Sequence, residues 1–342
     1  MKILIHTYET AYQNKAGGVH NRIERTVLAL KSNGIEVEFF DKYKTNITDF
    51  NLLHVFKLDL SSKALIDYAV SMGVKVVVSS IMTIEKGWLV TFYWKIRHLP
   101  FATLYKQVFT ICKKVDGMIV ETPREAQFMK RYYHLDDDKL AIIPNGAESI
   151  SNSTDLIFDR LKCRCDYAII VARFDENKNQ LNVIKALKST NINVVFVGGP
   201  DSTSREYYDK CILEAKNCNN FHFLGWLNSE DRLLKSALGN AKVLVCPSYH
   251  ETFGLSIIEG IMAGATPVIS NKLPILDFEL LSDCLTFNPN NLDDIRKQIK
   301  KAMDMKRNQD FISKIEAYFS WDSIARQHIE FYKSVINNKE NS

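Results

Sequence analysis

Two glutamates in the C-terminal third of the chain, Glu251 and Glu259, occupy a setting that suits ligand binding. The apolar run Val243–Cys246 predicts a strand, which Pro247 ends because proline cannot continue a central strand. Gly254 then permits a tight turn. The helix that follows is predicted from apolar residues at helical spacing: Ile257, Ile258 and Ile261. Glu251 therefore belongs to the loop, and Glu259 to the second turn of the helix.

The spacing of the two carboxylates limits what they can bind. Eight helical residues span about 12 Å, so the pair cannot grip one small group but could hold the two ends of an extended ligand. The first N–H groups of a helix attract anions, so a phosphate or diphosphate suits the middle, near Gly254 and Leu255. A sugar, a diphosphate and a ribose occur in that order in a nucleotide sugar. The alternative is that both glutamates are solvated surface residues.

Further candidates follow other apolar runs. Arg173 comes at the end of one predicted strand and Lys178 five residues later in a polar loop, where two cations could stabilise charge on a leaving diphosphate. Gly17-Gly18 follows the first strand and allows a close backbone approach, although it is not the G-x-G-x-x-G of dinucleotide sites. Surface charge and a simple flexible loop are the alternatives. Two other strand ends carry Gly198 and the pair Gly225-Trp226, and Trp226 could equally be a packing residue.

Strands alternate with amphipathic stretches along the whole chain, which predicts an α/β fold with two mainly parallel sheets. At 342 residues, two domains are expected. Ligands of such sheets lie beyond the carboxyl ends of the strands, so two domains that face each other would form an interdomain cleft. Six strands are predicted in each half: Lys2–His6, Val37–Phe40, Leu52–Phe56, Lys75–Ser79, Gly117–Val120 and Leu140–Ile143, then Tyr167–Ala172, Asn193–Val197, Phe221–Leu224, Val243–Cys246, Pro267–Ser270 and Cys284–Phe287.

The segment from Val243 to Ile269 resembles the E-x7-E region of the retaining GT-B glycosyltransferases of family four. Further landmarks appear in the family's order: Gly17-Gly18, Pro144-Asn145-Gly146, Arg173 with Lys178, Val197-Gly198-Gly199 and Leu224-Gly225-Trp226. The resemblance implies a GT-B type fold of two Rossmann-like domains. Residues 1–148 would form an acceptor-side domain and residues 149–318 the nucleotide-sugar-binding domain. Residues 319–342 would form a helix that crosses back to the first domain.

By this resemblance, Glu259 would bind the ribose hydroxyls and Glu251 a hydroxyl of the donor sugar. Arg173 and Lys178 would hold the diphosphate. The remaining donor-binding residues would be Gly17, Gly18, Gly198, Gly225, Trp226, Thr252, Phe253, Gly254 and Leu255. The implied activity is retaining transfer of a hexose from a nucleotide-diphosphate sugar to a saccharide or lipid-linked saccharide, in surface polysaccharide assembly.

Two departures from the family pattern bear on the sugar and the acceptor. The family often has a histidine after the strand that here ends at Ser79, where this chain has Ser80-Ile81-Met82-Thr83. The family's Gly-Gly after Val268-Ile269 is replaced by Asn271-Lys272-Leu273-Pro274. Two rivals therefore stay open: a nucleotide-sugar epimerase of the same fold, and a non-catalytic nucleotide-sugar-binding subunit.

We expect neither a cofactor nor a metal. The acidic run Asp136-Asp137-Asp138 lies between a predicted helix and a predicted strand, where a solvated turn is the simplest interpretation. The seven cysteines have no paired CxxC spacing and are expected to be reduced. The net charge of +4 is too small to indicate a nucleic-acid partner.

Residues 86–115 contain six basic residues, seven aromatic residues and no Asp or Glu. This composition suits the headgroup layer of an anionic membrane. The alternative is a helix whose aromatic residues face the core and whose lysines face water. With no apolar run long enough to span a bilayer and no signal peptide, the expected location is the cytoplasm, and possible membrane contact would be peripheral.

Overall fold

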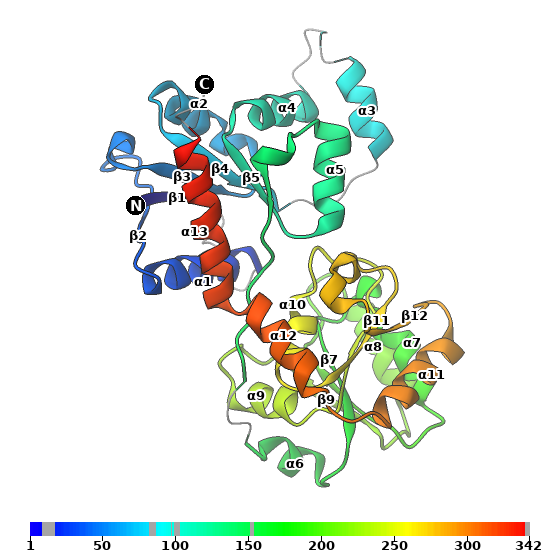
Figure 1. Cartoon of the computed structure of the whole chain (residues 1–342). Coiled ribbons are helices and arrows are strands. Elements are labelled where there is room, and N and C mark those ends of the chain that lie inside the picture. Colours follow the sequence, from blue (N-terminus) through cyan, green and yellow to red (C-terminus); the bar gives the residue numbers. More distant parts are fainter. Residues whose placement is uncertain (9–17, 82–86, 97, 99–102, 151–153, 339–342) are drawn as a thin grey trace. The chain divides into compact units, whose positions relative to one another are not determined.

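The computed structural model describes residues 1–342 except 9–17, 82–86, 97, 99–102, 151–153 and 339–342. The chain forms two compact units, one of Met1–Gly146 with Trp321–Ser342 and one of Ala147–Ser320. We call these unit 1 and unit 2 (Figure 1). The boundaries expected from the sequence were residues 148 and 318. The last helix of the chain is part of unit 1.

Unit 1 contains a six-stranded parallel sheet among its described residues, in the order β2-β1-β3-β4-β5-β6. Its order reverses between β1 and β3. The strands are β1 (Lys2–Thr7), β2 (Glu36–Phe39), β3 (Leu52–Phe56), β4 (Lys75–Ser79), β5 (Gly117–Val120) and β6 (Leu140–Ile142). The helices are α1 (Gly18–Ser32), α2 (Lys63–Ser71), α3 (Gly87–Lys95), α4 (Leu104–Lys114), α5 (Pro123–Tyr133) and α13 (Trp321–Asn337).

Unit 2 contains a second six-stranded parallel sheet, in the order β12-β11-β10-β7-β8-β9 over its described residues. Its strands are β7 (Tyr167–Val171), β8 (Asn193–Val197), β9 (Phe221–Gly225), β10 (Val243–Cys246), β11 (Thr266–Ser270) and β12 (Leu285–Phe287). Its helices are α6 (Leu156–Leu161), α7 (Gln180–Leu187), α8 (Arg205–Glu214), α9 (Arg232–Gly239), α10 (Leu255–Met262), α11 (Leu292–Met303) and α12 (Gln309–Phe319). This strand order is that of a doubly wound Rossmann sheet.

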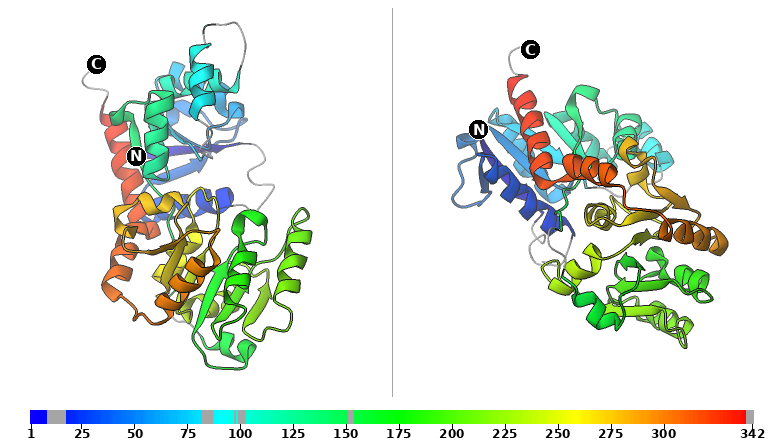
Figure 2. Two further views of the ribbon diagram at one scale, coloured as in Figure 1. Left: turned by 90° about the vertical axis from the view of Figure 1, so that its right-hand side faces the viewer. Right: turned by 60° about the horizontal axis from the view of Figure 1, so that its bottom comes forward.

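Central strands of both sheets, such as β3, β5 and β10, are buried on two faces, which explains why they are almost continuously apolar, whereas the edge strand β2 alternates. In unit 2, Ile169 and Leu244 pack in one core cluster, and their neighbours Ala168 and Val243 pack in the other. Helices cover both faces of each sheet in the two views of Figure 2. All twelve predicted strands are confirmed, with ends that differ by one residue at most.

The C-terminal helix expected to begin near Phe319 is present as α13. α12 ends at Phe319, and Ser320 is extended (φ −62°, ψ 147°), so α13 begins as a new helix at Trp321. α13 packs on α1 in unit 1. Gly146, also in unit 1, lies so close to Trp321 that an added Cβ would stand 2.4 Å from its ring.

Two buried histidines lie where α13 packs on the unit 1 sheet, His54 on β3 and His328 on α13. His54 Nδ1 lies 2.7 Å from Tyr332 Oη, and His54 Nε2 lies 2.9 Å from Ser79 Oγ. His328 Nδ1 lies 2.8 Å from the Ile324 carbonyl oxygen, while its Nε2 has no hydrogen-bond partner. Burial lowers the pKa of His54 well below its ordinary value and the pKa of His328 to about 4.

These lowered pKa values predict that unit 1 loses stability in mild acid. In the unfolded chain His328 binds a proton with a pKa near 6.5, whereas in the folded chain its pKa is about 4. The contribution of the neutral His328 to the free energy of unfolding is therefore fully present above pH 6.5 and decreases as the pH falls below that value. His328 alone should contribute a loss of about 2 kcal/mol between pH 7 and pH 5. Hydrogen exchange of α13 amides at the two pH values measures this loss.

The matched variants are His328→Leu, which should flatten the dependence, and His98→Leu at an exposed histidine, which should not. Equal pH dependence in His328→Leu and the unmodified protein would contradict the interpretation.

Among the described residues, no helix is both long enough and apolar enough to cross a membrane.

Candidate functional site

The candidate site lies at the carboxyl edge of the unit 2 sheet. β7 pairs with β10, and the strand order reverses between these two strands. Ligands of open α/β sheets bind at this reversal, because the loops that follow the two strands diverge there and leave a crevice. Arg173 and Lys178 follow β7, and Glu251 follows β10.

Two asparagines tie the loop after β7 to the loop after β10. Asn177 Nδ2 donates to the His250 carbonyl at 2.8 Å, and the His250 N–H donates to Asn177 Oδ1 at 2.9 Å. Asn179 Nδ2 donates to the Pro247 carbonyl at 3.2 Å. Asn179 has a φ of +57°, which asparagine tolerates better than most residues, and α7 begins directly after it. The residue between the two asparagines is Lys178.

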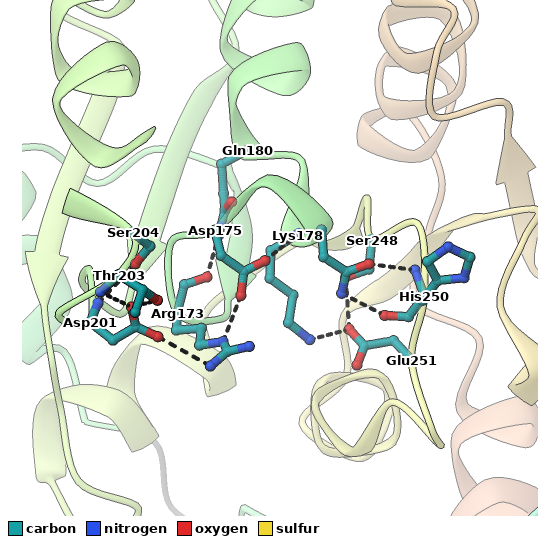
Figure 3. A network of polar contacts seen from close by, with 11 residues as sticks. Arg173, Asp175, Lys178, Gln180, Asp201, Thr203, Ser204, Ser248, His250 and Glu251 are labelled. Carbon is teal, nitrogen blue, oxygen red and sulfur yellow. Dashed lines mark hydrogen bonds and ion pairs between the residues drawn. The ribbon is translucent and has the colours of Figure 1, made fainter. Parts of the chain in front are cut away.

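Lys178 reaches across to Glu251, as Figure 3 shows. Its Nζ lies 2.6 Å from Glu251 Oε1, and both side chains are less than one-fifth exposed. Ser248 Oγ donates to the same carboxylate oxygen at 2.7 Å. The structure therefore brings together two residues that the sequence separates by 73 positions. The polar donors fix the carboxylate in one orientation.

Arg173 lies beside this pair but is more exposed, at 53% of its side chain. Its Nε is 2.5 Å from Asp175 Oδ2, and its Nη1 is 3.2 Å from Asp201 Oδ2. Hydrogen bonds from the Thr203 hydroxyl and N–H lower the pKa of Asp201 to about 2, so this partner stays ionised. Gln180 Nε2 donates to the Arg173 carbonyl at 2.8 Å and holds the strand end in place.

The N-terminus of α10 supplies main-chain donors between the two glutamates. Gly254 has a φ of +99° and precedes the first helical residue, Leu255. Thr252 is exposed, and Leu255 is half-buried. Phe253 is 3% exposed and packs against Phe278 and Phe319. Its side chain belongs to the core, so only its main chain remains for the donor-binding role that the sequence suggested.

Glu259 differs from Glu251 in having no partner. It is half-buried in the second turn of α10, and no described residue forms a hydrogen bond or an ion pair with its carboxylate. Burial raises the pKa of Glu259 above its ordinary value, and the nearby Glu148 carboxylate adds to the shift. A partly desolvated carboxylate without donors is a candidate for hydroxyl groups of a ligand.

The glycines predicted for donor binding have different environments. Gly198 has a φ of +122°, and a Cβ there would stand 2.1 Å from the Ala172 carbonyl oxygen. Gly225 has a φ of +74°, but a Cβ added to Gly225 would have no atom within 4 Å. Trp226 is 60% exposed, and its Nε1 donates to the Pro200 carbonyl at 3.3 Å. Gly17 lies outside the described residues, and Gly18 begins α1 in unit 1, on the other sheet.

The residues that position this site were not predicted. They fix the predicted cations and Glu251, yet polar residues in loops have no signal of their own in a single sequence: Asn177, Asn179, Ser248, Asp175 and Asp201.

Unit 1 contains a buried polar cluster that was also missed. Arg22 pairs with Glu121, and Asn145 Nδ2 donates to the same Glu121 oxygen at 3.4 Å. Glu125 accepts from the Glu121 N–H at 2.7 Å and from the Ser80 hydroxyl. Burial, with the Glu121 charge next to it, raises the pKa of Glu125 to about 7. Ser80 thus has a structural partner at the position where the family often carries histidine.

The two cations of the unit 2 site are already paired with carboxylates. Lys178 pairs with Glu251, and Arg173 pairs with Asp175 and Asp201. An incoming anion must therefore compete with these carboxylates. Exchange at the exposed Arg173 is cheap, because exposed ion pairs stabilise by only about 0.2–1 kcal/mol. An anion that takes Lys178 away from Glu251 leaves the Glu251 carboxylate in need of another hydrogen-bond donor.

Substitutions at Gly198 and Gly225 test which of the two glycines the fold of unit 2 requires for packing. Gly198→Ala should lower the free energy of unfolding of unit 2 by more than about 2 kcal/mol, because its Cβ meets backbone and its φ is strained. Gly225→Ala has open space and should lose only about 1 kcal/mol. Urea unfolding measures both values, and equal losses would refute the packing argument.

Comparison with known proteins adds a family and several relatives. Residues 162–317 match the family described as glycosyl transferases group 1. The O-antigen chain mannosyltransferase RfbU of Salmonella typhimurium is 27% identical over 236 residues, which are 68% of this chain and 59% of that protein. The GDP-mannose:cellobiosyl-diphosphopolyprenol alpha-mannosyltransferase of Komagataeibacter xylinus is 28% identical over 42% of this chain and 37% of its own length. The chain thus spans less than two thirds of these curated relatives.

Solved structures share the fold over nearly the whole chain. Sucrose-phosphate synthase from Thermosynechococcus elongatus has a TM-score of 0.73 at 16% identity and covers 99% of this chain and 100% of its own. Anabaena HepE in complex with UDP has a TM-score of 0.74 at 14% identity, with coverage of 98% and 100%. The α/β fold of GT-B type predicted from the sequence is confirmed.

Proposed function

We propose that the protein transfers a hexose from a nucleotide-diphosphate sugar to a saccharide or lipid-linked saccharide, with retention of the anomeric configuration. One observation carries the proposal. At the strand-order reversal of unit 2, the Lys178–Glu251 pair lies in the loops that follow β7 and β10, ahead of the N-terminus of α10. The second turn of α10 carries Glu259, whose carboxylate has no hydrogen-bond or ion-pair partner among the described residues. The group 1 match over residues 162–317 covers all of these residues.

Each group has a role that follows from its surroundings. The α10 N–H groups of Gly254 and Leu255 and the cations Arg173 and Lys178 receive the diphosphate. Glu259 accepts hydrogen bonds from the ribose hydroxyls, which replace the water that its burial excludes. Glu251, once Lys178 turns to phosphate, accepts from a hydroxyl of the donor sugar. After this exchange Glu251 keeps the Ser248 hydroxyl as a second donor. Asp175 and Asp201 lose Arg173 but keep hydrogen bonds from the Lys178 N–H and from Thr203.

The chemical step needs no enzymic nucleophile. The bond between the anomeric carbon and the β-phosphate oxygen breaks, and negative charge grows on the diphosphate, where Lys178, Arg173 and the helix N-terminus stabilise it. The acceptor hydroxyl attacks the anomeric carbon from the side that the phosphate leaves. Its proton passes to a phosphate oxygen, so the sugar keeps its configuration. We propose that these fixed cations act in place of a metal.

The relatives' names support the choice of donor and pathway. RfbU is an O-antigen chain mannosyltransferase, and the Komagataeibacter relative uses GDP-mannose and a diphosphopolyprenol-linked acceptor. HepE was solved with UDP. We propose a role in surface polysaccharide assembly at the cytoplasmic face of a membrane, with mannose as the first sugar to test.

A panel of nucleotide sugars tests the reaction. Released nucleotide together with a new glycoside of the donor's anomeric configuration, formed equally with and without a chelator, is the expected result. An isomerised donor would indicate an epimerase, and binding without turnover would indicate a nucleotide-sugar-binding subunit. A product of opposite configuration, read by NMR, would overturn retention.

Donor affinity tests the assignment of the site residues. Glu259→Gln and Lys178→Met should each weaken nucleotide-sugar binding about tenfold or more, because each removes a charge-assisted hydrogen bond. Titration calorimetry measures the affinity. Arg205→Gln, at an exposed arginine on α8, is the matched control and should bind the donor normally.

The double variant Lys178→Met with Glu251→Gln separates two causes. If Lys178→Met acts only by leaving the Glu251 carboxylate unpaired, the second change should restore affinity. We expect no recovery, because the phosphate contact is still missing. Unchanged affinity in both single variants would refute the site.

A further inference from the structure

We propose that α3, with the adjoining α4, forms a surface that docks on an anionic lipid bilayer. α3 lies at the outer side of unit 1, where one of its faces packs on α4 and α5 (Figure 1). Val90 is fully buried on the packed face. The Trp94 ring lies 4.7 Å from the Phe109 ring and 4.5 Å from the His134 ring, measured between centroids. The side of α3 that faces α4 and α5 is therefore covered by other side chains of unit 1.

The outward side is aromatic as well. Trp88 is 65% exposed and Phe92 is 52% exposed. Their spacing of four residues places them on one helix face, and the exposed Lys95 continues that face three residues later. Two large exposed aromatic side chains on one helix face cost free energy in water unless something covers them. The alternative, in which the aromatic residues of this segment face the core, holds for Trp94 and Phe109 but not for Trp88 and Phe92.

The charge around these aromatic residues selects the partner. Residues 86–115 contain six cations and no acidic residue. Lys114 is paired with Asp67 across 2.6 Å, while Lys113 is exposed and lies over the Trp94 ring at 5.9 Å. Lys86 and Arg97 lie outside the described residues. Aromatic side chains flanked by cations match the interface of a bilayer, where rings lie at the headgroup level and cations meet anionic phosphates.

Charge complementarity and side-chain type together favour lipid over protein. A protein interface of this kind would be expected to deplete lysine, whereas interfacial helices are rich in lysine beside tryptophan and phenylalanine. No described helix can cross the bilayer, so the attachment would be peripheral. The proposal that α3 and α4 bind a bilayer does not depend on the proposed reaction. A role for this binding in bringing the enzyme to a lipid-linked acceptor rests on the proposed function.

Vesicle flotation with the full chain tests the surface directly. Vesicles of phosphatidylcholine with phosphatidylglycerol should float the protein, pure phosphatidylcholine should float much less, and added salt should release it. Trp88→Ala with Phe92→Ala should reduce the partition coefficient at least tenfold. Lys95→Gln should reduce it about fivefold, since each cation near an anionic surface contributes about that factor, and Lys95→Arg should restore it.

Matched controls separate a local contact from general stickiness. Tyr43→Ala removes an aromatic side chain that is 84% exposed elsewhere in unit 1 and should leave flotation unchanged. Brominated lipids should quench tryptophan fluorescence on binding. Trp88→Phe should abolish most of this quenching, whereas Trp321→Phe, at a half-buried residue that begins α13, should not.

Circular dichroism and thermal unfolding, measured without lipid, show whether each variant is folded, and neither measurement depends on vesicle binding or on donor binding. A protein that fails to float, floats equally on neutral vesicles, or floats undiminished after the change at Trp88 and Phe92 would overturn the proposal. None of these results would bear on donor binding in unit 2.

Discussion

The contact between the loops that follow β7 and β10 is the constraint on which the unit 2 site depends. Parallel pairing of these strands brings two loops, distant in sequence, to the same edge. Asn177 and Asn179 then clamp the second loop by its main-chain groups, so the contact does not depend on which side chains that loop carries. Lys178 lies between the two asparagines in the sequence, and its side chain reaches Glu251 in the second loop.

This clamp explains how a site can be charged and yet stable before its ligand arrives. A half-buried lysine or carboxylate alone would lose several kcal/mol of hydration, but as a hydrogen-bonded pair they compensate each other. The pair is therefore a resting state that a diphosphate and a sugar hydroxyl can replace together. Glu259 has no such partner among the described residues, and its pKa is raised because burial removes hydration from the carboxylate.

Much of the fold could be predicted from the sequence because it depends on local patterns. Doubly covered strands such as β10 are continuous apolar runs, and Pro247 and Gly254 mark where the strand ends and α10 begins. The sequence does not decide features that depend on distant packing. Phe253 is buried because it packs against Phe278 and Phe319, and no local spacing reveals those contacts. For Trp88 the sequence left both a core and a surface position open, and the residue is exposed. The Arg22–Glu121 pair is hidden for the same reason, since 99 residues separate its members.

The most direct measurement of the central claim is a crystal structure of the protein with a bound nucleoside diphosphate. The account predicts the diphosphate within hydrogen-bonding distance of Lys178 Nζ and the N–H groups of Gly254 and Leu255. It also predicts the ribose hydroxyls on the Glu259 carboxylate. A nucleotide bound at another edge of either sheet, with the Lys178–Glu251 pair intact and Glu259 without a ligand contact, would contradict it.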